Sequence, residues 1–278
     1  MGLRISTNVQ SLAAQRFLGN NRMNSDKSLE RLASGSRINR AGDDAAGLAI
    51  SEKLKANIRS MKQATRNAND GISLVQVAEG AMNEVSNILI RLRELSIQTS
   101  SDTIGDTERG FVDKEVQHLK AEVNRIAGGT EFNGTKLLNG TSPQLDIQVG
   151  INNNPTQDRF QFDSKGLVTS LESLGIGNVS NLTRENSQQN LTMLDGAINK
   201  VNENRSSLGA LQNRLGSTIN NLNIYRENLE GANSRIRDTD MAEETAELTK
   251  NNILSQANIS VLSQANQNSQ MALKLLQN

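Results

Sequence analysis

The chain has 278 residues, enough for one large domain or two ordinary ones, and its 30 basic and 30 acidic residues give a formal net charge of zero. It has no cysteine, which excludes disulfides and thiolate metal sites, and a single histidine, which excludes multi-histidine metal sites. No basic stripe of the kind that binds nucleic acid is present, and no cofactor is expected. Hydrophobic residues make up 35% and aromatic residues 2% of the chain, which favours long helices sharing thin apolar seams over a spherical core.

The first 34 residues predict an amphipathic helix that is low in bulk and rich in Asn, Gln and Ser. Such a helix is marginally stable alone in water, so we expect it to pair with the other chain end and with further copies. Its apolar face comprises Ile5, Val9, Leu12, Ala13, Leu29, Leu32 and Ala33.

The stretch NRAGDDAAGLAI, residues 39–50, places two adjacent carboxylates, Asp43 and Asp44, close to Arg37 and Arg40. A metal site for a hard cation needs several oxygen ligands, and a calcium loop needs carboxylates at alternate positions; neither pattern is here. We therefore interpret the pair as a helix start, with Asp43 as the cap and Asp44 in the first turn, where its charge favours the positive helix end. The two arginines are expected to pair with these carboxylates or with another copy of the chain.

A long helix is predicted from about Asp44 to about Gln98, where apolar residues alternate spacings of four and three as in a coiled-coil seam. At 1.5 Å per residue it is roughly 80 Å long, which suits a rod better than a globule. Gly71 and Gly80 either permit a close approach to this helix or shape an interruption of the seam at Val75. The seam comprises Leu54, Ile58, Met61, Thr65, Ala68, Ile72, Val75, Ala78, Met82, Val85, Leu89 and Leu92.

A second helix is predicted from about Asp106 to Ile126, followed by a short central region with β character. Asn133-Gly134 is a hairpin turn signal, and apolar residues alternate with polar ones over 145–151 and 160–162. One or two small hairpins are therefore expected within about residues 130–180.

Helix is predicted again from about Glu185 to Asp238, and the tail continues to Leu275 with apolar residues at helical spacing. The tail resembles the N-terminal segment in its Asn, Gln and Ser content and its low bulk. Both ends therefore have the pattern of segments that become stable through assembly.

His118 lies on the second predicted helix beside Glu115 and Glu122. A catalytic base needs a nucleophile or metal nearby, and the sequence singles out neither, so an exposed structural histidine is the simpler interpretation. Charged residues on the long helix, such as Arg91, are interpreted as a solvated face or as contacts to neighbours in an assembly.

Several of these blocks together resemble the bacterial flagellins. The N-terminal half contains ERLASGSRINRAGDDAAGLAISEKL and RNANDGISLVQVAEGAMNE, and the C-terminal half contains ANSRIRDTDMAEE and SQANISVLSQANQNSQMALKLL. One departure is Ser269, where the family often has proline, which affects the local rigidity of the last helix. The matching blocks are residues 30–54, 66–84, 91–98, 131–138, 213–215, 232–244 and 255–276.

The resemblance implies a mainly α fold, with a long helical coiled-coil rod formed by both chain ends and a small central β-hairpin region. It implies a terminal coiled-coil domain of residues 1–34 and 240–278, connectors at 35–45 and 236–239, and a rod domain of 46–235. The short centre resembles a minimal flagellin without large outer domains. The filament-core interface would include Ile5, Val9, Leu12, Leu254, Ala257, Val261, Met271 and Leu275.

The family also implies a set of partners and a route out of the cell. The subunit would leave through the flagellum's own export channel, which fits the N-terminus without the apolar core of a secretory signal. Partners would be further copies of the chain, an export chaperone at the C-terminal region, a filament cap and hook-junction proteins. A Toll-like innate receptor would contact a surface at Arg91, Leu95 and Glu115.

The function expected is that of a structural subunit that self-assembles into the flagellar filament. The first alternative is a hook–filament junction protein with flagellin-like ends. The second is an enzyme, because some flagellins carry an inserted protease; the absence of an HExxH motif and the short centre disfavour it.

Overall fold

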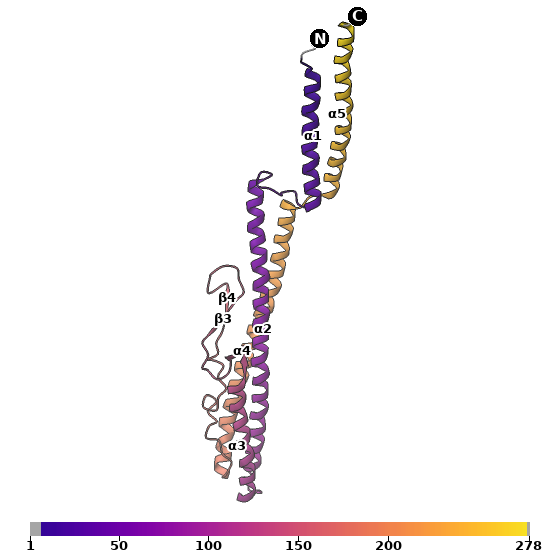
Figure 1. The fold of residues 1–278 in the computed structure, drawn as a ribbon. Coiled ribbons are helices and arrows are strands. Elements are labelled where there is room, and N and C mark those ends of the chain that lie inside the picture. The colour runs from indigo at the N-terminus through magenta and orange to yellow at the C-terminus, as the bar shows by residue number, and fades with distance from the viewer. Residues whose placement is uncertain (1–6, 277–278) are drawn as a thin grey trace. The chain divides into compact units, whose positions relative to one another are not determined.

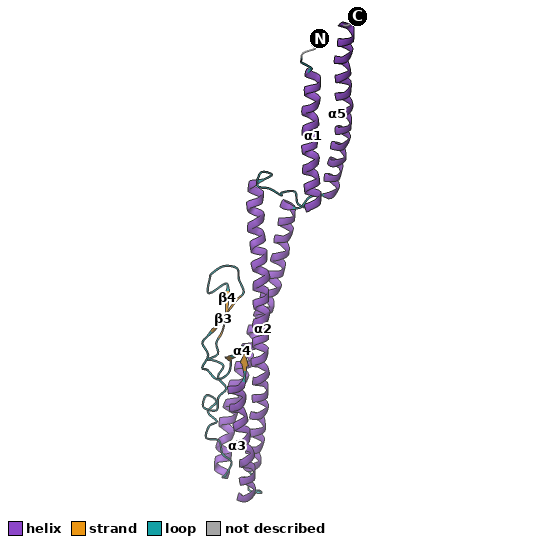
Figure 2. Ribbon diagram, viewed as in Figure 1, coloured by secondary structure: helices purple, strands orange, loops and turns teal. Residues whose placement is uncertain are grey.

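The computed structural model describes residues 7–276, with side chains described for residues 7–267. Over this range the chain is mainly α, with short strands in its centre (Figures 1 and 2). This confirms the fold class expected from the sequence. The helices are α1 (Val9–Ser34), α2 (Ala45–Thr99), α3 (Asp106–Gly129), α4 (Arg184–Arg237) and α5 (Met241–Leu276). The strands are β1 (Glu131–Phe132), β2 (Thr135–Lys136), β3 (Leu145–Gln148) and β4 (Arg159–Phe162).

The chain divides into two compact units. The terminal unit contains Met1–Ala56 and Asn228–Asn278, and the rod unit contains Asn57–Glu227. The division falls inside α2 and α4, so the first turns of α2 and the last turns of α4 belong with the chain ends. The domain boundaries expected at the connectors stay a prediction.

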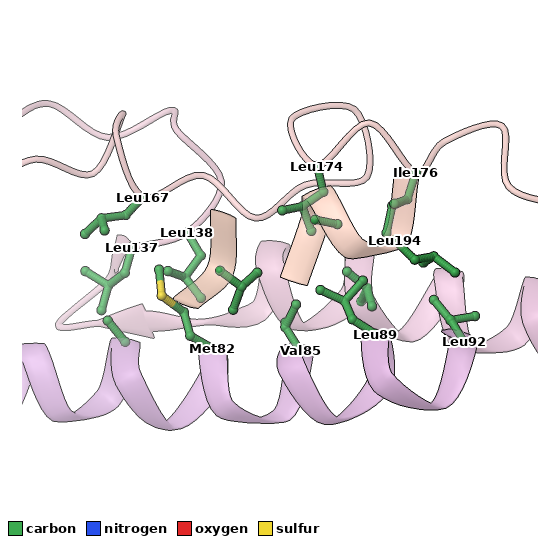
Figure 3. Close-up of a cluster of buried hydrophobic side chains, with 14 of the residues drawn as sticks. Met82, Val85, Leu89, Leu92, Leu137, Leu138, Leu167, Leu174, Ile176 and Leu194 are labelled. Carbon is green, nitrogen blue, oxygen red and sulfur yellow. The ribbon is translucent and has the colours of Figure 1, made fainter. Parts of the chain in front are cut away.

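The core of the rod unit lies along one face of α2 (Figure 3). Met82, Val85, Leu89 and Leu92 recur at spacings of three and four and are fully buried, because these spacings keep one face of a helix toward its neighbours. Leu194 of α4 lies against the same face. The segments after α3 cover the rest of it with Leu137, Leu138, Phe162, Leu167, Leu174, Ile176 and Val179.

Two antiparallel hairpins occupy the centre, as the turn signals predicted. β1 pairs with β2 around Asn133 and Gly134, whose φ values of 50° and 78° are the left-handed conformations that a tight hairpin turn requires. β3 pairs with β4, with Ile147 opposite Phe160.

Gly71 of α2 is explained by the second hairpin. A Cβ at Gly71 would lie 2.9 Å from Cδ1 and 3.2 Å from Cγ2 of Ile147, so the missing side chain permits the hairpin to approach α2 closely. A Cβ at Gly80 would have no heavy atom within 4 Å, and nothing in the structure explains that glycine.

Candidate assembly surface

The contact between α1 and α5 within the terminal unit is made mostly by small and polar side chains. The least exposed positions on both helices follow the three-and-four spacing of a coiled-coil seam. Few of them are bulky, so the seam removes little apolar surface from water. On α1 they are Ser11, Ala14, Leu18, Asn21, Ser25, Ser28 and Leu32, and on α5 they are Leu248, Asn251, Ser255, Asn258, Leu262 and Ala265.

The bulky apolar side chains of the same two helices are exposed instead. Phe17 is 53% exposed, Met23 is 66% exposed and Ile253 is 61% exposed. A folded protein rarely leaves so many large apolar groups in water unless they form an interaction surface. The full set is Val9, Leu12, Phe17, Met23 and Leu29 on α1, with Met241, Ile253, Leu254, Ile259 and Val261 on α5. We call these residues the outer apolar set.

The expected filament-core residues fall on this surface as far as the structure describes them. Val9, Leu12, Leu254 and Val261 belong to the outer apolar set, and Ala257 is also exposed. Ile5 lies outside the described residues. The side chains of Met271 and Leu275 lie outside the described side chains. Their role in an interface stays a prediction.

Polar groups in the seam are only partly satisfied. Asn8 donates from Nδ2 to the carbonyl of Ala265 at 2.9 Å, and its Oδ1 caps α1 by accepting from the backbone nitrogen of Ser11 at 3.0 Å. The hydroxyl of Ser25 and the Nε of Arg31 are buried without a hydrogen-bond partner in the structure. Because buried unsatisfied polar groups oppose folding, they weaken the α1–α5 contact further.

The two connectors between the helices, residues 35–44 and 238–240, are paired through their backbones. The nitrogen of Arg37 donates to the carbonyl of Arg237 at 2.6 Å, and the nitrogen of Thr239 donates to the carbonyl of Gly35 at 3.0 Å. Gly35 ends α1 with a φ of 68°, a left-handed conformation that glycine adopts without strain. The connectors are thus hydrogen-bonded segments rather than isolated linkers.

Of the two adjacent carboxylates, Asp44 is the one that caps the helix, so the assignment of the cap to Asp43 was wrong by one position. α2 begins at Ala45, and Oδ1 of Asp44 accepts from the backbone nitrogen of Gly47 at 2.8 Å. Asp43 instead closes the preceding turn, because its Oδ2 accepts from the backbone nitrogens of Asn39 and Arg40 at 3.2 and 3.1 Å.

The cation beside Asp43 is Lys27, whose Nζ lies 2.8 Å from Oδ1 of Asp43. The hydrogen bond from Lys27, followed by those from the backbone nitrogens, lowers the pKa of Asp43 from 3.8 to about 2. The expected pairing of the Arg37 and Arg40 side chains with these two carboxylates is wrong within this chain. Arg40 pairs with Glu30 at 3.0 Å, and Arg37 donates to the carbonyl of Ile236 at 2.8 Å. Pairing of the arginines with another copy stays a prediction.

The expected receptor surface is divided by the fold. Arg91 of α2 and Glu115 of α3 are exposed and form an ion pair at 3.0 Å. Leu95 is 2% exposed and belongs to the core, so its place on a surface was wrong. Leu95 lies three residues after the buried Leu92, so the same helix face carries both.

The described residues give no indication of catalytic chemistry. His118 is exposed, and no group of three or more His, Cys, Asp or Glu side chains within them is placed to hold a metal ion. No helix over this range is long and apolar enough to cross a membrane.

Comparisons with known proteins identify the family. Residues 5–143 match the bacterial flagellin N-terminal helical region, and residues 191–276 match the bacterial flagellin C-terminal helical region. A flagellin of Halalkalibacterium halodurans is 46% identical over 98% of this chain and 99% of its own length. A flagellin of Bacillus subtilis is 42% identical over 99% of this chain and its whole length. A flagellar filament 33 kDa core protein of Treponema phagedenis is 39% identical over 98% of this chain and 99% of its own.

Solved structures agree with this assignment. The crystal structure of Bacillus cereus flagellin matches with a TM-score of 0.50 and 32% identity, over 56% of this chain and 88% of that one. A putative flagellar hook-associated protein from Vibrio parahaemolyticus matches with a TM-score of 0.60 over 70% of this chain and all of its own, but at 13% identity it shows the shared fold alone. The matches at high identity name filament proteins, so the junction alternative is not favoured. The chain belongs to the bacterial flagellins and is a structural subunit of the flagellar filament.

Proposed function

We propose that the terminal helices reach a stable fold only when copies of the chain assemble. The observation that carries this proposal is the distribution of side chains in the terminal unit, with mostly small and polar residues in the α1–α5 seam and ten bulky apolar residues outside it. Nine of the ten residues of the outer apolar set are more than half exposed, and Leu254 is 41% exposed. Burial of the apolar surface that each of these side chains still exposes would contribute about 1 kcal/mol. The ten together would contribute on the order of 10 kcal/mol per subunit before entropic costs.

Assembly is then coupled folding and binding: neighbours in the filament bury the outer apolar set and thereby stabilise the helices that carry it. Export through the narrow flagellar channel suits a subunit whose ends are weakly folded before assembly. An export chaperone would cover the exposed apolar residues of α5 until then. The subunit would also contact the filament cap and the hook-junction proteins at the two ends of the filament.

Two further parts of the proposal rest on family resemblance. The filament lies outside the cell, where a Toll-like innate receptor would meet the exposed Arg91–Glu115 pair. The chain has a structural role without catalysis. Substitution of Asp43 or Asp44 is therefore expected to change the stability of the protein, and no hydrolytic activity that depends on either residue is expected.

Removal of residues 241–278 tests the assembly role. The truncated chain should retain the rod unit, seen as a cooperative thermal transition by circular dichroism, and fail to form filaments in electron micrographs. A matched full-length variant, Ile253→Ser with Leu254→Ser, should polymerise poorly, whereas Asn252→Ser at the exposed position beside them should polymerise normally. Normal filaments from the truncated chain would show that the proposed role of the ends is wrong.

A further inference from the structure

A hollow of about 320 Å³ opens in the rod unit beside the β3–β4 hairpin. Its apolar walls come from Met61 of α2, Phe160 of β4, Leu222 and Tyr225 of α4, and Val149 and Ile151 of the segment between β3 and β4. Tyr225 is 49% exposed, so the hollow is lined by aromatic surface that water contacts. A hollow with apolar and aromatic walls suits a large apolar side chain from a partner.

The hollow also holds a carboxylate without a counter-charge. Asp158 is 8% exposed, and its Oδ2 accepts from the backbone nitrogen of Asn154 at 2.9 Å. Among the described residues no lysine or arginine forms an ion pair with it. Buried carboxylates are usually paired with a cation, so an occupant that brings a positive charge beside an apolar group would fit.

An aromatic side chain of that kind is exposed elsewhere on the same unit. Phe111 on α3 is 64% exposed, more than any other large apolar residue described between 57 and 227. The ammonium nitrogen of Lys114 lies 5.7 Å from the centre of its ring. Phe111 and Lys114 therefore present an aromatic ring and a positive charge together.

Helix α3, which carries the pair, and the β3–β4 hairpin, which borders the hollow, lie beside different stretches of α2 (Figure 1). Glu115 of α3 contacts Arg91, which is 30 residues along α2 from Met61 in the hollow. Phe111 is one turn farther from the hollow. At 1.5 Å per residue the separation along α2 is about 50 Å.

We propose that Phe111 of one subunit inserts into the hollow of another, with Lys114 beside Asp158. An open helical polymer needs a head-to-tail contact between two different patches on each subunit, and this pair of patches meets that requirement. Opposite charges favour the pairing. The contact displaces successive subunits by about 50 Å along the rod. The inference rests on the proposed self-assembly and adds a second, separate contact to it.

Purified full-length subunits test the contact through the critical concentration for polymerisation. Phe111→Ala should raise that concentration about tenfold or more, since buried aromatic anchors dominate such interfaces. Leu182→Ala, a change of an apolar residue that is 55% exposed, should leave it unchanged. Tyr225→Ala should also raise it, and adding Phe111→Ala to Tyr225→Ala should have little further effect. Additive effects, or a Phe111→Ala variant that polymerises like the parent, would overturn the proposal.

Cross-linking provides a second test that does not depend on stability, because the chain contains no cysteine. A chain carrying both Phe111→Cys and Thr218→Cys should give long covalent multimers in filaments treated with a short bis-maleimide. Each single variant should give no covalent product beyond a dimer. The control pair Leu182→Cys with Ile224→Cys should give no ladder; a ladder there, or none from the test pair, would contradict the contact. Failure of the contact while the truncated chain still fails to polymerise would leave the proposed function intact.

Discussion

Replacing Asp43 with asparagine should remove a pH-dependent contribution to filament stability. The carboxylate has a pKa of about 2 in the folded chain, against an ordinary value of 3.8. A difference of nearly two units corresponds to about 2.5 kcal/mol, and solvent around the half-exposed Lys27 reduces this to about 1–2 kcal/mol. Asparagine retains an oxygen that accepts from the backbone, so the variant isolates the loss of charge.

The sign of the pH dependence follows from the lowered pKa. Between pH 2 and pH 4 the unfolded chain binds more protons at this carboxyl than the folded chain, so stability falls as the pH falls. The contribution is fully present above about pH 4 and is lost as the pH approaches 2. Wild-type filaments should therefore exceed Asp43→Asn filaments in heat stability at pH 6, and the difference should shrink toward pH 2.

The assay is the temperature of heat dissociation of assembled filaments, followed by light scattering from pH 6 to the lowest pH at which filaments persist. Asp26→Asn is the matched control, because Asp26 is an exposed carboxylate on the same helix as Lys27. It should show no comparable pH-dependent difference. The same dissociation temperature for Asp43→Asn and wild type at pH 6 would refute the assigned role of the Lys27–Asp43 pair.

Three further changes test local contacts. Asp44→Ala removes the cap of α2 and should lower filament stability by about 1 kcal/mol per subunit, measured by heat dissociation; no change would refute the cap. Gly71→Val should destabilise unassembled subunits by roughly 1–3 kcal/mol more than Gly80→Val in urea titrations, since only the former meets the hairpin; equal losses would contradict the close approach. Lys120→Met leaves the carbonyl of Gly177 without its side-chain donor and that of Val179 with Gln117 alone, and should cost about 1–3 kcal/mol in the same titrations, whereas Lys165→Met at an exposed position should cost little.

The long helices were predictable because their apolar spacing is regular over many turns. The β1–β2 hairpin was predictable because Asn133-Gly134 supplies both left-handed residues of its turn. These signals are local in the sequence and need no knowledge of tertiary contacts.

The polar contacts at the connector were less predictable. Lys27 of α1 pairs with Asp43, and Arg37 donates to the carbonyl of Ile236, nearly 200 residues away in the sequence. The cap fell on Asp44 because Asp43 is engaged by the turn before it. Leu95 was placed on a surface by family resemblance, although its three-residue spacing from Leu92 indicated the core.

The distribution of side chains in the terminal unit was only partly visible in the sequence. The low bulk of both ends predicted marginal helices, but which side chains face the partner helix depends on how α1 and α5 pack. The seam that forms uses Ser28 and Asn251, which periodicity of apolar residues alone does not identify.

Amide hydrogen exchange, followed by mass spectrometry on unassembled subunits and on filaments, tests the central claim most directly. If assembly completes the fold of the chain ends, amides of α1 and α5 exchange rapidly in the subunit and slowly in the filament, while α2 around Leu89 is protected in both. Strong protection of α1 and α5 in the unassembled subunit, at the level of the rod core, would contradict the account.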